Sequence, residues 1–565
     1  MKPNLLTLIA LSLALQGCAT VTKSAVSEDA SNSQDYEAQG ELMYQMLVAE
    51  MAGRRGRVDL AMDGYLKASR SIDDPRLAER AARLAVYAKA WDSALEAGQR
   101  WVDLEPDNIN AHRLLVGVHL KHEDVKATAD TYERILELTS QPFDEGAGSV
   151  LTSLAREPQL PLAVKVAQEL SSRHPKSAMG HFLVARLAAA AQMNDTAIDA
   201  FDRTLELEPD LGRANLYRAQ LKSSMGHTDE ALSDLHAYLK RKPDDIPSQL
   251  GLANLLVDVG RHAEAEAHAN TLFQRYPDNG EVVFEIGLMA IDSKRFDAAQ
   301  TYLKRSVELL YKTSEAHYFI GRVAQTRREY AEAMSAYDQV SDGQYQLDAG
   351  IRAAELSATS ESLEVGLARL SSLSGQFATE DSARRLALAE ANILQSAGEQ
   401  KQALEVLNRA LEAQPSDRDI RYARGLAAEQ AGDSLLFEAD MQALVKQDPN
   451  NAHAMNALGY SLAERGERLE EAKQLIERAY QIKPDDPAII DSMGWVHFKL
   501  GDYPAAIEHL RRAYELMRDP EIAAHLGEVL WLAGEREEAQ QLLEAALDES
   551  PGDDRLRAVQ RKFKP

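Results

Sequence analysis

Apolar side chains recur along most of the chain at spacings of three and four residues. These spacings place side chains on one face of an α-helix, whereas a half-buried strand alternates with a period of two. No alternation of useful strand length is present, so the pattern predicts an all-α protein. A longer period of 34 residues is superimposed on it, marked by two runs of proline: Pro175, Pro209, Pro243 and Pro277, and then Pro415 and Pro449.

Small residues repeat in the same register. An alanine stands twelve residues before each proline position, at Ala197, Ala231, Ala265, Ala299 and Ala333. A small side chain lets two helices approach closely, and proline disfavours helix in the residue before it. We therefore expect helix pairs in which the alanine lies in the second helix and the proline follows its end. Asp or Asn after the proline should cap the next helix, as in the sequences that begin at Pro106, Pro277, Pro449 and Pro484.

A helix pair of 34 residues is the period of the tetratricopeptide repeat. The first helix of several pairs also carries an apolar residue followed by glycine, which indicates a tight crossing: Ile286-Gly287, Ile320-Gly321, Leu458-Gly459, Met493-Gly494 and Leu526-Gly527. The sequence therefore predicts a solenoid of about fifteen tetratricopeptide-type hairpins from roughly residue 42 to 551. Such stacking forms a right-handed superhelix whose first helices line a concave, partner-binding surface.

The most loop-like interior segment is SSLSGQFATEDS, residues 371–382. We expect a bend or a boundary there, between an N-terminal array over 36–370 and a C-terminal array over 383–551. Residues 552–565 should form a capping helix and tail, with Arg and Lys on the outer face. The apolar face of this last helix consists of Leu556, Val559 and Phe563.

The N-terminus has the organisation of an export signal: one lysine, an apolar run over 5–15, and small or polar residues before a cysteine. The apolar run is too short to span a bilayer, which needs about 20 residues. Leu15-Gln16-Gly17-Cys18 resembles the lipobox of bacterial lipoproteins.

That resemblance implies a signal peptide over 1–17 and acylation of Cys18 as the mature N-terminus. Ala19 follows the cysteine in place of the aspartate that retains such lipoproteins in the inner membrane. The implied address is the periplasmic face of the outer membrane, and the lipid is the membrane contact. Residues 18–35 would be the acylated cysteine and a flexible tether, since the segment lacks aromatic residues and apolar periodicity.

The charge of the chain narrows the choice of partners. Its formal net charge is −26. Nucleic acids and anionic lipid headgroups require a basic stripe, and only two short basic clusters are present, at Arg54–Arg57 and Arg555–Lys564. We therefore expect basic protein partners and no nucleic acid. Cys18 is the only cysteine, which excludes an intrachain disulfide and a thiolate metal cluster.

No catalytic motif is found: H-E-x-x-H, G-x-S-x-G, S-x-x-K, P-loop and G-x-G-x-x-G patterns are all missing from the sequence. His112, His119 and His122 share one helix face, but no cysteine or clear carboxylate partner completes a metal site. We expect no catalytic residue, no metal, and no cofactor beyond the lipid on Cys18. An enzyme with a repeat appendage is the remote alternative, because the array leaves no room for a catalytic domain.

Aromatic and polar residues on the first helices of the three C-terminal hairpins suggest a partner-binding groove. Large apolar side chains on an accessible concave wall are typical of binding sites. The candidate groove residues are Asn456, Tyr460, Asp491, Trp495, Phe498 and Trp531. The alternative interpretation is that the rings only bridge adjacent hairpins.

The segment 456–535 resembles the ending of a group of Gram-negative tetratricopeptide lipoproteins. Together with the lipobox and the length of the repeat body, it resembles the outer-membrane lipoproteins that bind and activate the carboxyl-terminal processing protease CtpA. The resemblance implies a non-catalytic adaptor that engages this periplasmic protease and delivers substrates such as peptidoglycan cross-link hydrolases. The alternative function is a scaffold for an envelope export or outer-membrane assembly complex.

Overall fold

The computed structural model describes the backbone of residues 30–563 and the side chains of residues 40, 41 and 43–563. The predicted signal peptide, Cys18 and the tether up to residue 29 lie outside the described residues. The tether was expected to reach residue 35, but helix α2 (Ala30–Arg54) already begins at Ala30. The prediction was wrong for residues 30–35, because extending an existing helix gains one hydrogen bond per residue without the cost of a new nucleus.

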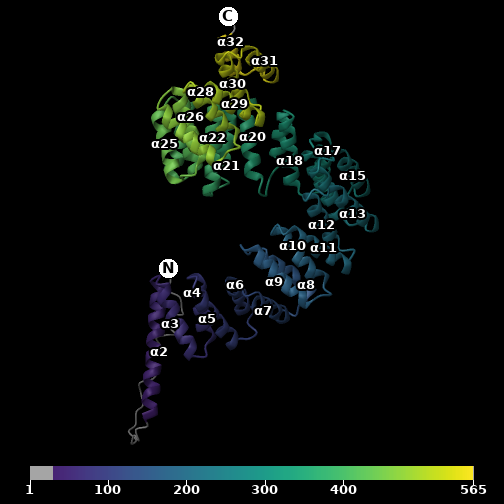
Figure 1. Cartoon of the computed structure of the whole chain (residues 1–565), viewed down its shortest axis with the longest axis vertical. Coiled ribbons are helices and arrows are strands. Elements are labelled where there is room, and N and C mark those ends of the chain that lie inside the picture. The colour runs from purple at the N-terminus through teal and green to yellow at the C-terminus, as the bar shows by residue number, and fades with distance from the viewer. Residues whose placement is uncertain (1–29, 564–565) are drawn as a thin grey trace. The chain divides into compact units, whose positions relative to one another are not determined.

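Every regular element of the described residues is an α-helix, and these residues contain no strand. The chain divides into two compact units after Arg261. Successive helices pack as hairpin partners within each unit (Figure 1). The first unit contains α2, α3 (Val58–Ser71), α4 (Pro75–Tyr87), α5 (Trp91–Leu104), α6 (Ile109–Lys121), α7 (Val125–Leu138), α8 (Phe143–Leu154), α9 (Leu160–Arg173), α10 (Ala178–Ala190), α11 (Asn194–Leu207), α12 (Gly212–Ser224), α13 (Thr228–Arg241) and α14 (Ile246–Asp258).

The second unit continues the same plan. It contains α15 (His262–Arg275), α16 (Gly280–Asp292), α17 (Phe296–Glu308), α18 (Thr313–Thr326), α19 (Tyr330–Tyr337), α20 (Gln346–Ser360), α21 (Leu363–Ser374), α22 (Glu380–Ser396), α23 (Gln400–Ala413), α24 (Arg418–Gln430), α25 (Ser434–Gln447), α26 (Ala452–Arg465), α27 (Leu469–Ile482), α28 (Pro487–Lys499), α29 (Tyr503–Leu516), α30 (Pro520–Ala533), α31 (Arg536–Glu549) and α32 (Asp554–Phe563). Within the units, pairs of consecutive helices such as α10 with α11, α26 with α27 and α28 with α29 pack together, which confirms the predicted helical-hairpin solenoid.

The proline repeat ends the second helices as predicted. Each proline of the two runs is the second residue after a helix end, following α9, α11, α13, α15, α23 and α25. The polar residues after the prolines cap the next helices. The side chain of Asn279 accepts a hydrogen bond from the backbone N–H of Val282, and that of Asn451 accepts one from Ala454. These bonds satisfy backbone donors that would otherwise have no partner at the helix start.

Small residues are buried where the helices cross. The five alanines of the repeat are between 0 and 4% exposed. A Cβ placed on Gly459 would lie 2.6 Å from Ile476 Cγ1 and 2.9 Å from the carbonyl oxygen of Ala472 in the partner helix. A Cβ on Gly494 would meet Leu510 at 2.6 Å. Glycine is therefore required at these crossings by helix packing.

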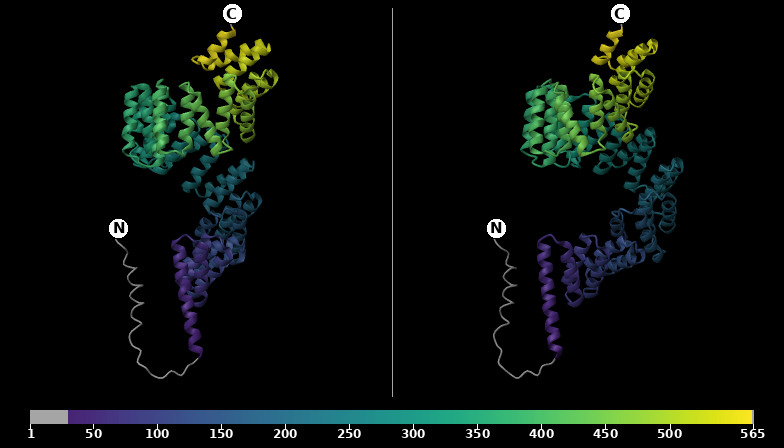
Figure 2. Two further views of the ribbon diagram at one scale, coloured as in Figure 1. Left: turned by 90° about the vertical axis from the view of Figure 1, so that its left-hand side faces the viewer. Right: turned by 60° about the vertical axis from the view of Figure 1, so that its left-hand side comes forward.

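The C-terminal end of the array is covered by a single helix, α32. Helix α32, at the yellow C-terminal end in Figure 2, packs on α30 and α31. It buries Leu556 and Val559. Its basic side chains reach back to the preceding first helix, where Arg555 pairs with Glu521 at 2.5 Å. The cap removes apolar surface from water at the exposed end of a stacked array.

The segment 371–382 lies within the second unit and not at the division after Arg261. Its first residues belong to the end of α21, and its last residues begin α22. These two helices pack together. Thr379 caps α22 through a reciprocal pair of hydrogen bonds with Ser382, so a polar composition here marks a helix start. None of the described helices combines the length and the apolarity that crossing a bilayer demands.

Candidate partner-binding groove

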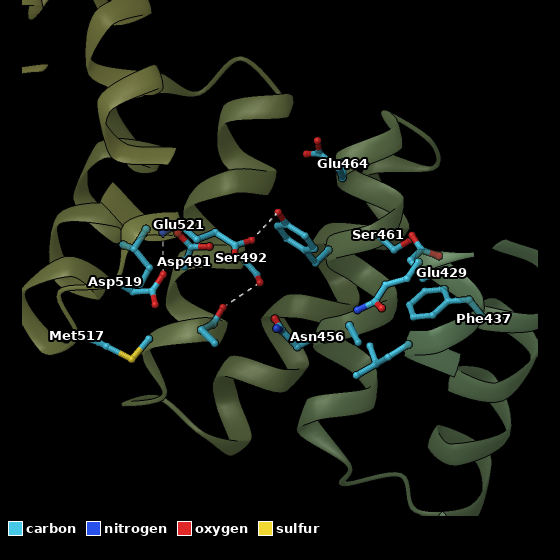
Figure 3. A pocket seen from close by; sticks show the side chains of 16 residues that line it. Glu429, Phe437, Asn456, Ser461, Glu464, Asp491, Ser492, Met517, Asp519 and Glu521 are labelled. Atoms are coloured by element: carbon cyan, nitrogen blue, oxygen red, sulfur yellow. Dashed lines mark hydrogen bonds between the residues drawn. The ribbon is translucent and has the colours of Figure 1, made fainter. Parts of the chain in front are cut away.

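An open hollow of about 680 Å³ lies on the first helices of the C-terminal hairpins. Its walls come from α24, α26, α28 and the start of α30, with Phe437 of α25 behind them (Figure 3). Three of the predicted groove residues line it: Asn456, Tyr460 and Asp491. The structure therefore brings half of the predicted set together on one surface.

Helical spacing explains which residues reach the hollow. Asn456, Tyr460 and Glu464 are four residues apart on α26, so they lie one above the other on a single face. The packing face of α26 is turned away from them and carries Leu458 and Leu462, which are buried. The same alternation of faces lets one helix contribute both to the core and to the groove.

A buried ion pair stands behind the groove wall. Asp491 Oδ2 lies 2.9 Å from Nδ1 of His525, and both side chains are largely buried. Burial alone would lower the pKa of His525, but the hydrogen bond and the charge of Asp491, with the charge of Glu521, outweigh burial and raise this pKa. The charged form of the imidazole is therefore favoured beside the carboxylate.

Tyr460 connects this pair to the rim of the hollow. Its hydroxyl lies 3.4 Å from Glu521 Oε1, to which it donates, and 3.4 Å from Nε2 of His525. Burial, followed by the charges of Glu521 and Glu464, raises the pKa of Tyr460. The phenol therefore stays protonated and acts as a hydrogen-bond donor.

The lining of the hollow is acidic. Its five carboxylates are Glu429, Glu464, Asp491, Asp519 and Glu521, and no lysine or arginine is among the lining residues. Figure 3 shows Asp491, Asp519 and Glu521 on one side, Glu429 beside Ser461 and Phe437 on the other, and Asn456 between them. Such a surface attracts a basic partner and repels an acidic one.

Trp495 and Phe498 do not line the hollow. Trp495 is 5% exposed, stacks on His525 with 4.1 Å between ring centroids, and donates from Nε1 to Glu464 Oε2 at 2.6 Å. Phe498 packs on Trp495 and on Tyr503 of the following helix. Trp495 therefore bridges adjacent hairpins, which was the alternative interpretation of its position, whereas the ring contacts of Phe498 lie within its own hairpin of α28 and α29.

The ring of Trp531 is also engaged in packing contacts within the protein. Its ring stacks on Phe563 of α32 with 5.0 Å between centroids. The guanidinium of Arg536 lies 5.5 Å from the centre of the indole. The capping helix therefore covers the ring that the sequence placed in the groove.

Of the five carboxylates of the hollow, the sequence reasoning named only Asp491 and missed the other four. Glu429 of α24 and Glu464 of α26 each lie one residue before the end of a first helix. Glu464 follows Tyr460 by four residues, so it lies on the same helix face. The helical period could therefore have predicted Glu464 as a groove residue together with Tyr460. Met517 and Asp519 lie in the connection before α30, for which the repeat pattern makes no prediction.

The described residues hold no group of three or more His, Cys, Asp or Glu side chains arranged to bind a metal ion. His112 is buried, with Nε2 2.9 Å from the carbonyl oxygen of Pro106. His119 is half-buried, and burial lowers its pKa. Packing therefore accounts for two of the three histidines that share a helix face.

Comparison with known proteins identifies the repeat. Models described as tetratricopeptide repeat match residues 222–290, 285–346, 388–436, 438–487 and 497–563. The chain is 31% identical over 541 residues to the TPR repeat-containing protein PA4667 of Pseudomonas aeruginosa, covering 93% of this chain and 90% of that protein. The chain belongs to the tetratricopeptide-repeat family.

Other known proteins match less of the chain or match it less closely. The bacteriophage adsorption protein A of Escherichia coli is 31% identical over 114 residues, which is 20% of this chain and 11% of that protein. Yeast Tom70 covers 72% of this chain and 92% of its own, with 12% identity and a TM-score of 0.38. The Cut9–Hcn1 hetero-tetramer covers 94% and 98%, with 13% identity and a TM-score of 0.33.

Tetratricopeptide repeats are protein-interaction modules, so this chain is a protein-interaction scaffold. The hollow on α24, α26, α28 and α30 lies on the first helices, which form the binding face of stacked helical repeats.

Proposed function

We propose that this protein is a lipid-anchored adaptor at the periplasmic face of the outer membrane. It binds and activates a carboxyl-terminal processing protease and delivers to it basic wall-binding enzymes such as peptidoglycan cross-link hydrolases. The anchor is the lipid on Cys18. The adaptor itself supplies no catalytic group.

The observation that carries the proposal is the acidic hollow on the first helices. A groove of about 680 Å³ with both apolar and carboxylate walls is suited to an extended or helical segment of another protein. Its charge favours substrates that carry the basic surfaces needed to bind an anionic cell wall. The lipobox-like N-terminus and the C-terminal run 456–535 supply the resemblance to protease-activating lipoproteins.

Affinity capture of the lipidated protein from envelope extracts tests the proposal, with mass spectrometry of the co-eluting proteins. We expect a processing protease together with wall hydrolases. A matched pair of variants places the contact: Asn456→Leu alters the hollow, and Leu435→Ala alters an exposed apolar residue of the neighbouring α25. Only the first variant should lose a partner.

Two results would contradict the proposal. Co-elution of secretion or barrel-assembly components in place of a protease would assign the protein to an export or assembly complex. Equal recovery of all partners by both variants would move the binding surface away from the hollow.

A further inference from the structure

Two buried acceptor atoms of the hollow have no hydrogen-bond donor. They are Oε2 of Glu429 and Oδ1 of Asn456. Among the described residues only one other buried side-chain nitrogen or oxygen is unsatisfied, Nε of Arg218 in the first unit. A buried polar atom without a partner is energetically unfavourable, so two such acceptors on one surface indicate that a bound group supplies the donors.

The remaining carboxylates around the hollow already have partners. Glu464 lies 3.4 Å from Nζ of Lys499, and Glu521 pairs with Arg555. Asp491 pairs with His525, and Asp519 accepts from the backbone N–H of Glu521 at the start of α30.

Only one of the two carboxylate oxygens of Glu429 has a partner within the protein. Its Oε1 accepts from Ser461 Oγ at 2.5 Å and lies 3.3 Å from Arg465 Nη1, which also contacts Ser461. Arg465 is shared with Glu438, 2.9 Å from its other terminal nitrogen. The second oxygen of Glu429 thus keeps its capacity to bind a donor from outside the chain.

The shape and the walls of the hollow define the group that fits. Exposed apolar side chains of the lining, Leu426 and Met517, can cover the aliphatic stem of a long basic side chain. A guanidinium has five N–H donors in a planar fork and no acceptor, so one group can serve acceptors on two neighbouring helices. An ammonium is a point charge and fits two separated acceptors less well.

We propose that the hollow is a recognition site for an arginine side chain, presented by a segment of the partner protein. Its guanidinium donates to Glu429 Oε2 and Asn456 Oδ1, and its stem packs on the apolar wall. The inference rests on the proposed function for the presence of a partner segment in the groove. It adds the residue type that the groove selects.

Peptide binding to the full chain purified in detergent tests the inference. The probes are fluorescein-labelled nonapeptides of Ala, Ser and Leu, with arginine, lysine or citrulline at the centre, measured by fluorescence polarisation. Citrulline has nearly the size and shape of arginine but no charge. We expect the arginine peptide to bind at least about tenfold more tightly than the citrulline peptide, with lysine between them.

Two glutamate variants separate recognition from structure. Glu429→Gln and Glu438→Gln each weaken an ion pair with the same Arg465, but only Glu429 lines the hollow. Glu429→Gln should remove the preference for arginine over citrulline, and Glu438→Gln should change it less than about twofold.

Equal affinity for the arginine and citrulline peptides would overturn the inference. So would an equal loss of the arginine preference in both glutamate variants. A third contrary result is no binding of the arginine peptide at 1 mM, a concentration that corresponds to a binding free energy on the order of −4 kcal/mol. The proposed function is judged separately by envelope capture. If the Glu429→Gln protein still captures the protease and the hydrolases, the proposed arginine site is wrong but the proposed adaptor function is retained. If capture with the wild-type protein returns neither the protease nor the hydrolases, the proposed adaptor function is wrong, whatever the peptide affinities are.

Discussion

Replacing Trp495 with alanine tests the packing role that the structure gives to this residue. Its indole is 5% exposed, and its removal from a buried site destabilises a protein by about 3–5 kcal/mol. The lost hydrogen bond to Glu464 adds little, because this carboxylate is 52% exposed and keeps Lys499 as a partner. We therefore expect the local free energy of unfolding around α26, α28 and α30 to fall by about 3–5 kcal/mol.

Native-state hydrogen exchange is the appropriate assay. The stability of a repeat array is close to a sum of hairpin and neighbour contributions, so a single global transition does not describe it. A loss of 3 kcal/mol raises the exchange rate of the affected amides on the order of 10²-fold. Leu435→Ala is the control in the same unit, since Leu435 is 85% exposed and should change stability by less than about 0.5 kcal/mol.

The reasoning fails if the amides of α28 exchange at the wild-type rate in the Trp495→Ala protein. The indole would then contribute nothing to the contact between hairpins. If the Trp495→Ala protein lost a partner while its amides exchanged at the wild-type rate, Trp495 would be a partner-binding residue of the groove. If Trp495 instead supports the groove wall by packing behind it, the variant should show both faster amide exchange and weaker partner binding.

Three further changes have outcomes of defined sign. Gly459→Ala should destabilise the second unit by about 1–3 kcal/mol through overpacking, whereas Gly148→Ala, with open space around its Cβ, should stabilise its helix by about 0.5–1 kcal/mol; denaturation of both variants checks this. The raised pKa of His525 stabilises the fold fully below the unfolded value of about 6.5, and this contribution is lost as pH rises through the higher folded pKa. Exchange in α30 should therefore quicken from pH 6 to 9, after correction for intrinsic rates, and Asp491→Asn should abolish or reverse that slope. Cys18→Ser should release the protein from the outer-membrane fraction, and retention in the membrane pellet would exclude the lipid anchor.

The helical hairpins could be predicted because each repeat constraint is local in sequence. Ala299 must be small because its helix α17 packs closely on the preceding helix α16, and Pro277 ends a helix by its own geometry. The period repeats these constraints often enough to align the helices. The division after Arg261 has no such local signature, because contacts among many helices determine it.

The groove was predicted only in part, and two equivalent positions show why. Tyr460 and Trp495 each follow the glycine of a helix crossing, so the sequence assigns them the same role. In the structure Tyr460 lines the hollow, whereas Trp495 is covered by His525 of the next hairpin. The neighbouring repeat decides between groove and core. Glu429 was missed for a related reason: 89 acidic residues make any single one uninformative until the helices bring a few together.

Site-specific photocrosslinking in cells tests the central claim most directly. A photoreactive amino acid is placed at Gln430, an exposed residue that lines the hollow, and for comparison at Gln474, an exposed residue of the second helix α27 that does not line it. We predict that position 430 crosslinks to a periplasmic processing protease or to a wall hydrolase, and that position 474 does not. Crosslinks of equal yield from both positions, or crosslinks only from position 474, would contradict an adaptor that binds its partners through this groove.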